Sequence, residues 1–131
     1  MEILYGEGVG RQRHWHLYAD QTPPRAEISY DRAPDAVAMT PEHALAWMAA
    51  QADRHAERIP SHQQANARRL TEDARLREVH LAALSWGRST GAIINLGPDT
   101  ALRLYAHSVG PSDSKACLPS LLPAVCDQQH A

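Results

Sequence analysis

The sequence predicts a single α+β domain in which two antiparallel β-hairpins flank two amphipathic helices. Two observations favour this class. Apolar and polar residues alternate with the period of a strand near both ends of residues 1–109, and apolar residues recur with a helical period between these segments. With 131 residues, the chain is long enough to bury a core without disulfides. We therefore expect residues 1–109 to form one domain, followed by a Pro-rich tail over residues 110–131.

Composition and charge indicate a globular protein and disfavour a membrane protein or a dedicated nucleic-acid binder. Hydrophobic residues make up 44% and charged residues 21% of the chain, which is typical of globular proteins. The net charge of −2 provides no general attraction for a polyanion. No apolar run approaches the roughly 20 residues of a membrane-spanning helix, and residues 1–10 lack the pattern of a signal peptide. We expect a cytoplasmic protein that does not associate with membranes.

The N-terminal hairpin is predicted from two alternating segments. Residues 14–19 place Trp15 and Leu17 on one face and His14, His16 and Tyr18 on the other, as in a half-buried strand. Residues 26–31 alternate in the same way after a Pro-containing loop. Residues 3–5 and 37–39 are candidates for further short strands.

Two helices are predicted to meet at Pro60. The first begins after Thr40, whose hydroxyl is a good cap and is followed by a proline at the first helical position. It ends near Ile59, because Pro60 lacks the amide that the next turn needs. Ser61 and Gln64 have the spacing of a capping box, which predicts a second helix over residues 62–86 with its apolar second half in the core.

The second hairpin is predicted around Gly97-Pro98-Asp99-Thr100, a composition that favours a turn. Residues 92–96 and 101–106 flank this turn. Residues 101–109 leave two interpretations open, a strand or a helix capped by Thr100, and the alternation of apolar residues favours the strand. The prolines of the tail exclude a long helix, which leaves a packed arm or a partly disordered segment over residues 110–131.

His14 and His16 are the candidate metal ligands, because residues i and i+2 of a strand point to the same side. A zinc ion takes three or four protein ligands, and Asp20, His43 or His107 is the expected third one. The segment from His14 to Asp20 resembles the H-x-H strand element of cupins, but the cupin glycine after the acid and a second histidine motif are missing. The alternative interpretation is two partly exposed histidines that bind no metal.

A nucleic-acid surface is a further candidate. Arg11 and Arg13 lie beside Trp15, a combination that contacts phosphates and stacks on bases, and Arg68 and Arg69 are able to extend it. Acidic residues interleave with the arginines from residue 68 onward, which favours a salt-bridged, solvated helix face instead.

The sequence offers no convergent acid, base and nucleophile, and it implies no particular cofactor. We therefore expect a non-enzymatic interaction or regulatory protein. The apolar excess of the second predicted helix, together with Trp86 and the leucines of the tail, favours a homodimer, and oligomers of this size are usually two-fold symmetric. The predicted interface with a partner protein is apolar and consists of Leu76, Val79, Trp86, Leu121 and Leu122.

Overall fold

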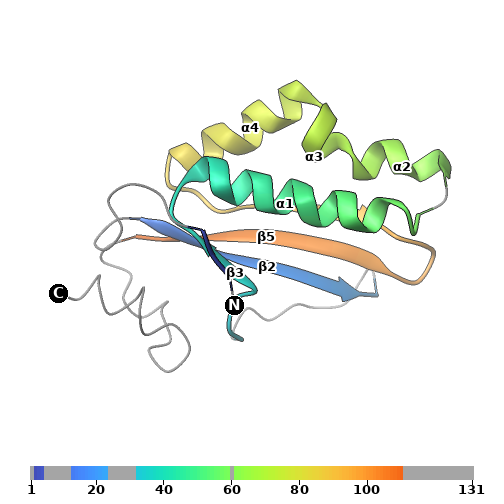
Figure 1. Ribbon diagram of the computed structural model, residues 1–131, viewed down its shortest axis with the longest axis horizontal. Helices are drawn as coiled ribbons and strands as arrows, with labels where there is room; N and C mark the ends of the chain where they lie inside the picture. Colours follow the sequence, from blue (N-terminus) through green and yellow to red (C-terminus); the bar gives the residue numbers. More distant parts are fainter. Residues whose placement is uncertain (1, 5–12, 24–31, 60, 111–131) are drawn as a thin grey trace.

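The computed structural model describes residues 2–4, 13–23, 32–59 and 61–110, which fold into a single β-sheet covered on one face by a layer of helices (Figure 1). This arrangement confirms the predicted α+β class. The strands are β1 (Glu2–Leu4), β2 (His14–Thr22), β3 (Ala36–Ala38), β4 (Thr90–Asn95) and β5 (Ala101–Val109). The helices are α1 (Pro41–Ala56), α2 (Ser61–Ala67), α3 (Arg69–Glu72) and α4 (Ala74–Ser85).

The sheet has the strand order β1-β3-β2-β5-β4, with β1 parallel to β3 and the other neighbours antiparallel. The second hairpin is confirmed, because β4 and β5 pair directly and the Leu96 amide donates to Thr100 O at 2.9 Å. The strand prediction for residues 101–109 is correct and the helix alternative is wrong. At the N-terminus, β2 pairs with β3 and β5, whereas the expected partner strand over residues 26–31 lies outside the described residues.

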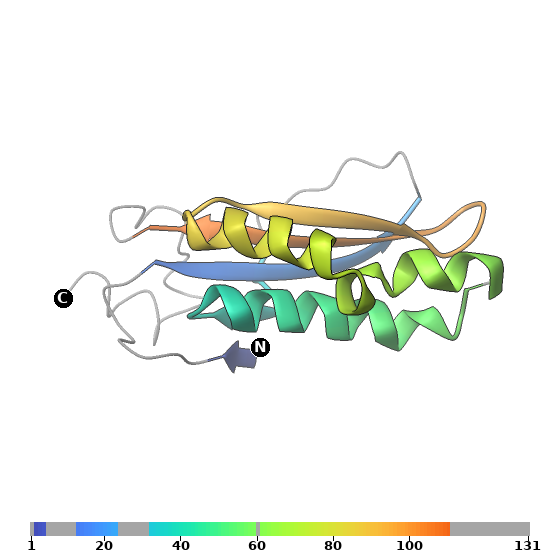
Figure 2. The same ribbon diagram turned by 90° about the horizontal axis from the view of Figure 1, so that it is seen from above.

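The core fills the space between the sheet and α1. Leu17 of β2 and Leu102 and Leu104 of β5 point toward the helices and are at most 2% exposed. α1 meets them with Met48 and several alanines, whose small side chains let the helix approach the sheet closely. Burying each leucine stabilises the fold by about 2 kcal/mol before the cost in conformational entropy. α1 and the α2–α4 segment run side by side over the sheet (Figure 2).

α1 begins where the sequence predicts. Thr40 has an extended backbone, and its hydroxyl accepts a hydrogen bond from the His43 amide at 3.1 Å. The helix ends at Ala56, and a turn follows up to Ile59. The side-chain amide of Gln64 in α2 donates to Ile59 O at 3.3 Å, so it connects the start of α2 to the end of the turn after α1.

The predicted single helix over residues 62–86 is wrong, because the structure divides the segment into α2, α3 and α4. Asp73 leaves the helical conformation (φ −85°, ψ 100°), and its carboxylate accepts the Leu76 amide at 3.0 Å. A short acidic side chain competes for nearby backbone amides, so this residue starts a new helix instead of continuing the old one. Only His80 and Leu84 of α4 are buried, which corrects the expectation that its second half lies wholly in the core.

Residues 111–131 lie outside the described ranges, so the predicted tail and the interface residues Leu121 and Leu122 stay predictions. In the segments that the structure describes, no helix combines the length and apolar character that crossing a bilayer requires.

Loss of the α1 cap tests this account of where the helix layer begins. Thr40→Ala is expected to lower the free energy of unfolding by about 1 kcal/mol, because the His43 amide loses its acceptor. Urea unfolding followed by circular dichroism measures this change. Thr40→Ser is the matched control and keeps most of the stability. Equal midpoints for Thr40→Ala and the wild-type protein would contradict the capping role.

Candidate functional site

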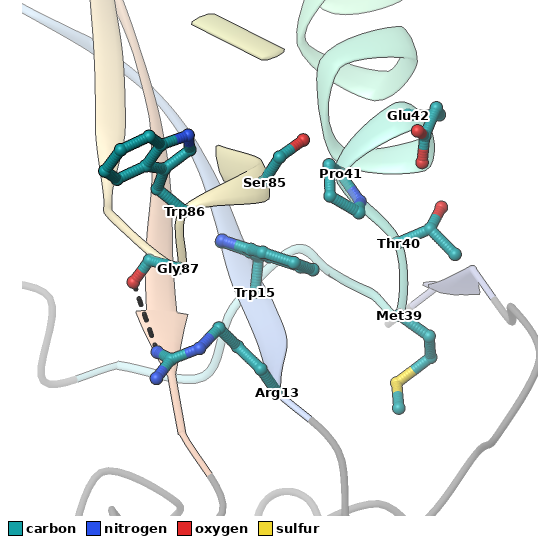
Figure 3. Close-up of a pocket in the computed structure, with 9 residues that line it drawn as sticks. All are labelled: Arg13, Trp15, Met39, Thr40, Pro41, Glu42, Ser85, Trp86 and Gly87. Carbon is teal, nitrogen blue, oxygen red and sulfur yellow. Dashed lines mark hydrogen bonds between the residues drawn. The ribbon is translucent and has the colours of Figure 1, made fainter. Parts of the chain in front are cut away.

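A groove of about 760 Å³ lies between the start of α1 and the end of α4 (Figure 3). Figure 3 shows Trp15 of β2 between Ser85 and Trp86 on one side and Thr40 and Pro41 on the other. The residues that line it are Arg13, Trp15, Met39, Thr40, Pro41, Glu42, Ser85, Trp86 and Gly87. The groove therefore joins segments that are widely separated in the sequence.

Hydrogen bonds hold the floor of this groove to the end of α4. Arg13 Nη1 donates to Gly87 O at 3.2 Å and to Ser108 Oγ at 2.6 Å, and the Ser108 hydroxyl donates to the same carbonyl at 2.7 Å. Trp15 Nε1 donates to Arg88 O at 3.4 Å. Hydrogen bonds from strands β2 and β5, and from Arg13 just before β2, thus hold the turn that follows α4 in place.

Gly87 is required at this turn by its conformation and by its surroundings. Its φ of +77° is a left-handed value, which glycine adopts readily and which ends α4. A Cβ added there would lie 2.6 Å from Nε of Arg13 and 2.9 Å from Cζ of the same residue. Any larger residue would both strain the turn and displace the arginine that fastens it.

Trp86 stands at the rim of the groove with 78% of its surface exposed. The guanidinium of Arg88 lies 5.8 Å from its ring centroid, within the range of a cation–π contact. An exposed tryptophan beside a hollow is typical of a binding surface, because an indole contributes a large apolar area with little conformational entropy to lose.

The structure places the predicted interface residues of α4 at different depths. Val79 is 61% exposed and, seven positions before Trp86, lies about two helical turns from it on the same side of α4. Leu76 is partly buried and packs against the core, so only part of its side chain is accessible.

A cluster of histidines occupies the sheet face opposite the helices, which we call the far face. His14 and His16 of β2 point there because their neighbours Trp15 and Leu17 point into the core. His14 Nε2 lies 3.1 Å from His16 Nε2, and His107 pairs with His16 across β5 with ring centroids 6.4 Å apart. His14 is 0% and His16 2% exposed, so the expectation of partly exposed histidines is wrong.

Burial sets the electrostatics of this cluster. It lowers the pKa of His16 to about 3, and the electrostatic effect of the neighbouring His14 and His107 acts in the same direction. His16 is therefore neutral at pH 7. A contact of 3.1 Å between two imidazole nitrogens requires one to donate a proton and the other to accept it.

The same distance suits two nitrogen ligands on one metal. Zinc–nitrogen bonds of about 2.0–2.1 Å at a tetrahedral angle separate the two nitrogens by roughly 3.3 Å. Among the described residues, however, no group of three or more His, Cys, Asp or Glu side chains is arranged to hold a metal. His14 and His16 therefore make a two-ligand arrangement at most within these segments.

The proposed third ligands are placed differently from one another. Asp20 forms an ion pair with Arg32 at 2.9 Å, and this arginine also pairs with Asp35 at 3.1 Å. His43 lies in the first turn of α1, on the helix side of the sheet. His107 lies beside the pair on the far face, where its ring stacks on Tyr105 with centroids 6.0 Å apart.

The candidate nucleic-acid contacts do not form one patch among the described residues. Arg13 contacts Gly87 just after α4, whereas Arg68 and Arg69 precede α4 at its opposite end. The 12 residues of α4 span about 18 Å. Arg69 also pairs with Asp73 at 3.6 Å, as the interleaved charges indicate, and Arg11 lies outside the described residues.

Sequence reasoning missed the groove because its floor and its rim are far apart in the chain. Arg13 and Gly87 are 74 positions apart, and nothing near either residue predicts that they meet. Two lining residues were singled out from the sequence, Trp86 in the predicted interface and Thr40 as a helix cap, but neither signal indicates that the two segments meet.

Acid should destabilise the fold through His16. The unfolded imidazole binds a proton near pH 6.5 and the folded one only near pH 3, so the unfolded state binds more protons between these values. We expect the free energy of unfolding to fall by about 1.4 kcal/mol per pH unit as the pH drops through this window. Urea unfolding from pH 7 to pH 4 measures the slope.

His16→Gln removes the titrating group and is expected to flatten that slope. His43→Gln is the matched control, because it removes an exposed histidine and leaves His16 in place. A slope that is the same in His16→Gln as in the wild-type protein would contradict the assignment.

Comparisons of this chain with family models, with curated proteins and with solved structures found no match. The groove at Trp86 and the far-face histidines are therefore interpreted from their own geometry.

Proposed function

We propose that this chain is a non-enzymatic, homodimeric interaction protein of the cytoplasm, whose partner protein binds in the groove beside Trp86. The observation that carries the proposal is the 78% exposure of Trp86 at the rim of the groove, whose floor is held to the end of α4 by the hydrogen bond from Arg13 to Gly87 O. Trp86 also belongs to the apolar interface that the sequence predicts.

The shape and chemistry of the groove favour a short apolar segment of a partner. Its volume of about 760 Å³ lies in the range that holds a few side chains. Trp15 and Met39 supply apolar lining, and the exposed Trp86 has room to close over an inserted side chain. An acidic group next to that side chain would meet Arg88, which already lies near the indole.

The polar groups of the groove suit binding better than catalysis. Thr40 and Ser85 bring hydroxyls, but no histidine is among the described residues that line the groove to take a proton from them. The Thr40 hydroxyl is also engaged as the cap of α1. Glu42 brings a carboxylate to the same lining, but among the described residues no hydrogen bond joins it to either hydroxyl, so these groups are better suited to be hydrogen-bonding partners of a peptide.

Peptide selection tests the proposal directly. Peptides selected from a random display library on the full chain are expected to carry an apolar or aromatic residue beside an acidic one. Trp86→Ala should weaken their binding at least about ten-fold, or about 1.4 kcal/mol, because the indole is the largest contact surface. Isothermal titration calorimetry measures the dissociation constants.

Trp86→Phe is the matched control and should retain part of the affinity, since it keeps an aromatic ring at the rim. Thermal unfolding should change little in either variant, because Trp86 is exposed. Selected peptides that bind Trp86→Ala as tightly as the wild-type protein would contradict the proposed site.

A metal-binding role for His14 and His16 is the second candidate. The specific observation in its favour is the 3.1 Å separation of their Nε2 atoms, together with the lowered pKa that keeps His16 neutral and able to ligate.

Elemental analysis of protein purified without a histidine tag tests the metal role. Binding predicts close to one zinc or similar ion per chain, lost in the double variant His14→Gln/His16→Gln but kept in the exposed control His43→Gln. Circular dichroism checks that the double variant is folded. A wild-type protein that holds no metal, even after incubation with Zn²⁺, would exclude this role.

A further inference from the structure

Strand β4 forms one edge of the sheet that the described residues build, and its sequence lacks the charges and prolines that usually protect such an edge. Edge strands expose a row of backbone N–H and C=O groups, and proteins block them with charges, prolines, bulges or short length. β4 consists of Thr-Gly-Ala-Ile-Ile-Asn, with no charge and no proline, and it pairs with β5 in unbroken register over all six residues. The opposite edge, β1, has three residues.

The outward-facing groups of β4 follow from the β4–β5 ladder. The Leu96 amide donates to Thr100 O, so this pair is hydrogen-bonded, and antiparallel pairs alternate between bonded and non-bonded along the ladder. The amides and carbonyls of Gly91, Ile93 and Asn95 therefore point away from β5. Among the described residues, no strand or loop pairs with this outer side.

Exposed apolar side chains lie near the β4 edge on both faces of the sheet. Ile93 is 61% exposed and pairs with Arg103, which places it on the far face. On the other face α4 packs against β4, where His80 Nδ1 lies 2.8 Å from the Thr90 hydroxyl. Val79 of α4, next to that contact, is also 61% exposed.

We propose that β4 pairs antiparallel with β4 of a second copy, about a two-fold axis at Ile93, so that the two sheets become continuous. The pairing rests on the proposed homodimer and specifies its interface. Ile93 then lies opposite Ile93 of the partner subunit, and Gly91 opposite the partner's Asn95. Each of these pairs exchanges two backbone hydrogen bonds.

A second copy fits this edge because the strand is complementary to itself. Gly91 and Asn95 are equally far from Ile93 on either side. A two-fold axis at Ile93 therefore places the outward N–H and C=O groups of each copy opposite those of the other, as an isologous interface requires. Ile93 and its symmetry mate cover each other on the far face. Gly91 has no side chain, which leaves room for the partner's Asn95.

Sedimentation velocity over a concentration series of the full chain tests the pairing. The wild-type protein is expected to be a dimer, and Ile93→Lys should raise the dimer dissociation constant at least about ten-fold, because two charges would face each other. Ile93→Pro should do the same by removing an outward N–H, while the β4–β5 ladder keeps its bonds. Trp86→Lys is the matched control, since Trp86 is similarly exposed but lies outside β4, and this variant should remain dimeric.

Hydrogen exchange gives an independent readout. The amides of Gly91, Ile93 and Asn95 should be protected in the wild-type protein and exchange fast in Ile93→Lys, whereas those of Ala92 and Ile94 should be protected in both. A monomeric wild-type protein, or a dimer that dissociates in Trp86→Lys and not in Ile93→Lys, would overturn the pairing.

The two interfaces can fail separately. Ile93→Lys should bind the groove peptides as the wild-type protein does, and Trp86→Ala should form the same dimer. A monomeric wild-type protein that still binds the selected peptides through Trp86 would contradict the pairing and leave the groove standing. A wild-type dimer that Ile93→Lys dissociates, and whose selected peptides bind Trp86→Ala unchanged, would contradict the groove and leave the pairing standing.

Discussion

The nine-residue ladder between β2 and β5 is the constraint on which the rest of this structure depends. It joins residues 14–22 to residues 101–109, and every other described strand attaches to one of these two, directly or through β3. One side of the ladder is leucine and alanine and holds the helices, while the other carries the histidines and tyrosines. Because so many contacts connect distant regions of the chain, folding should be slower than in a helical bundle of this size.

Both candidate sites are products of this pairing. His107 joins the far-face pair His14 and His16 because it is in register with His16 across the β2–β5 ladder. The groove exists because Arg13, just before β2, and Ser108, near the end of β5, converge on the carbonyl of Gly87. A single backbone oxygen therefore links the two central strands to the end of α4, and the position of Trp86 follows from it.

Features that depend on neighbouring residues could be predicted from the sequence, and features that depend on distant contacts could not. Thr40 and the Gly97–Thr100 turn act within a few residues, so the start of α1 and the β4–β5 hairpin were predicted correctly. Asp73 was interpreted as one more charge on a helix surface, although its side chain competes with the helix for the Leu76 amide. The burial of His14 and His16 was also missed, because strand alternation shows which residues share a face but not whether that face is covered.

The break at Asp73 makes the helix layer easier to unfold locally than a continuous helix would be. α2, α3 and α4 have seven, four and 12 residues, and isolated helices below about 12–15 residues are marginal in water. Each piece therefore keeps its shape only while it is docked on α1 and the sheet. This layer is expected to open as a partly independent unit, at lower free energy than the β2–β5 ladder, and its opening would expose the apolar side of β4 and β5 before the sheet itself came apart.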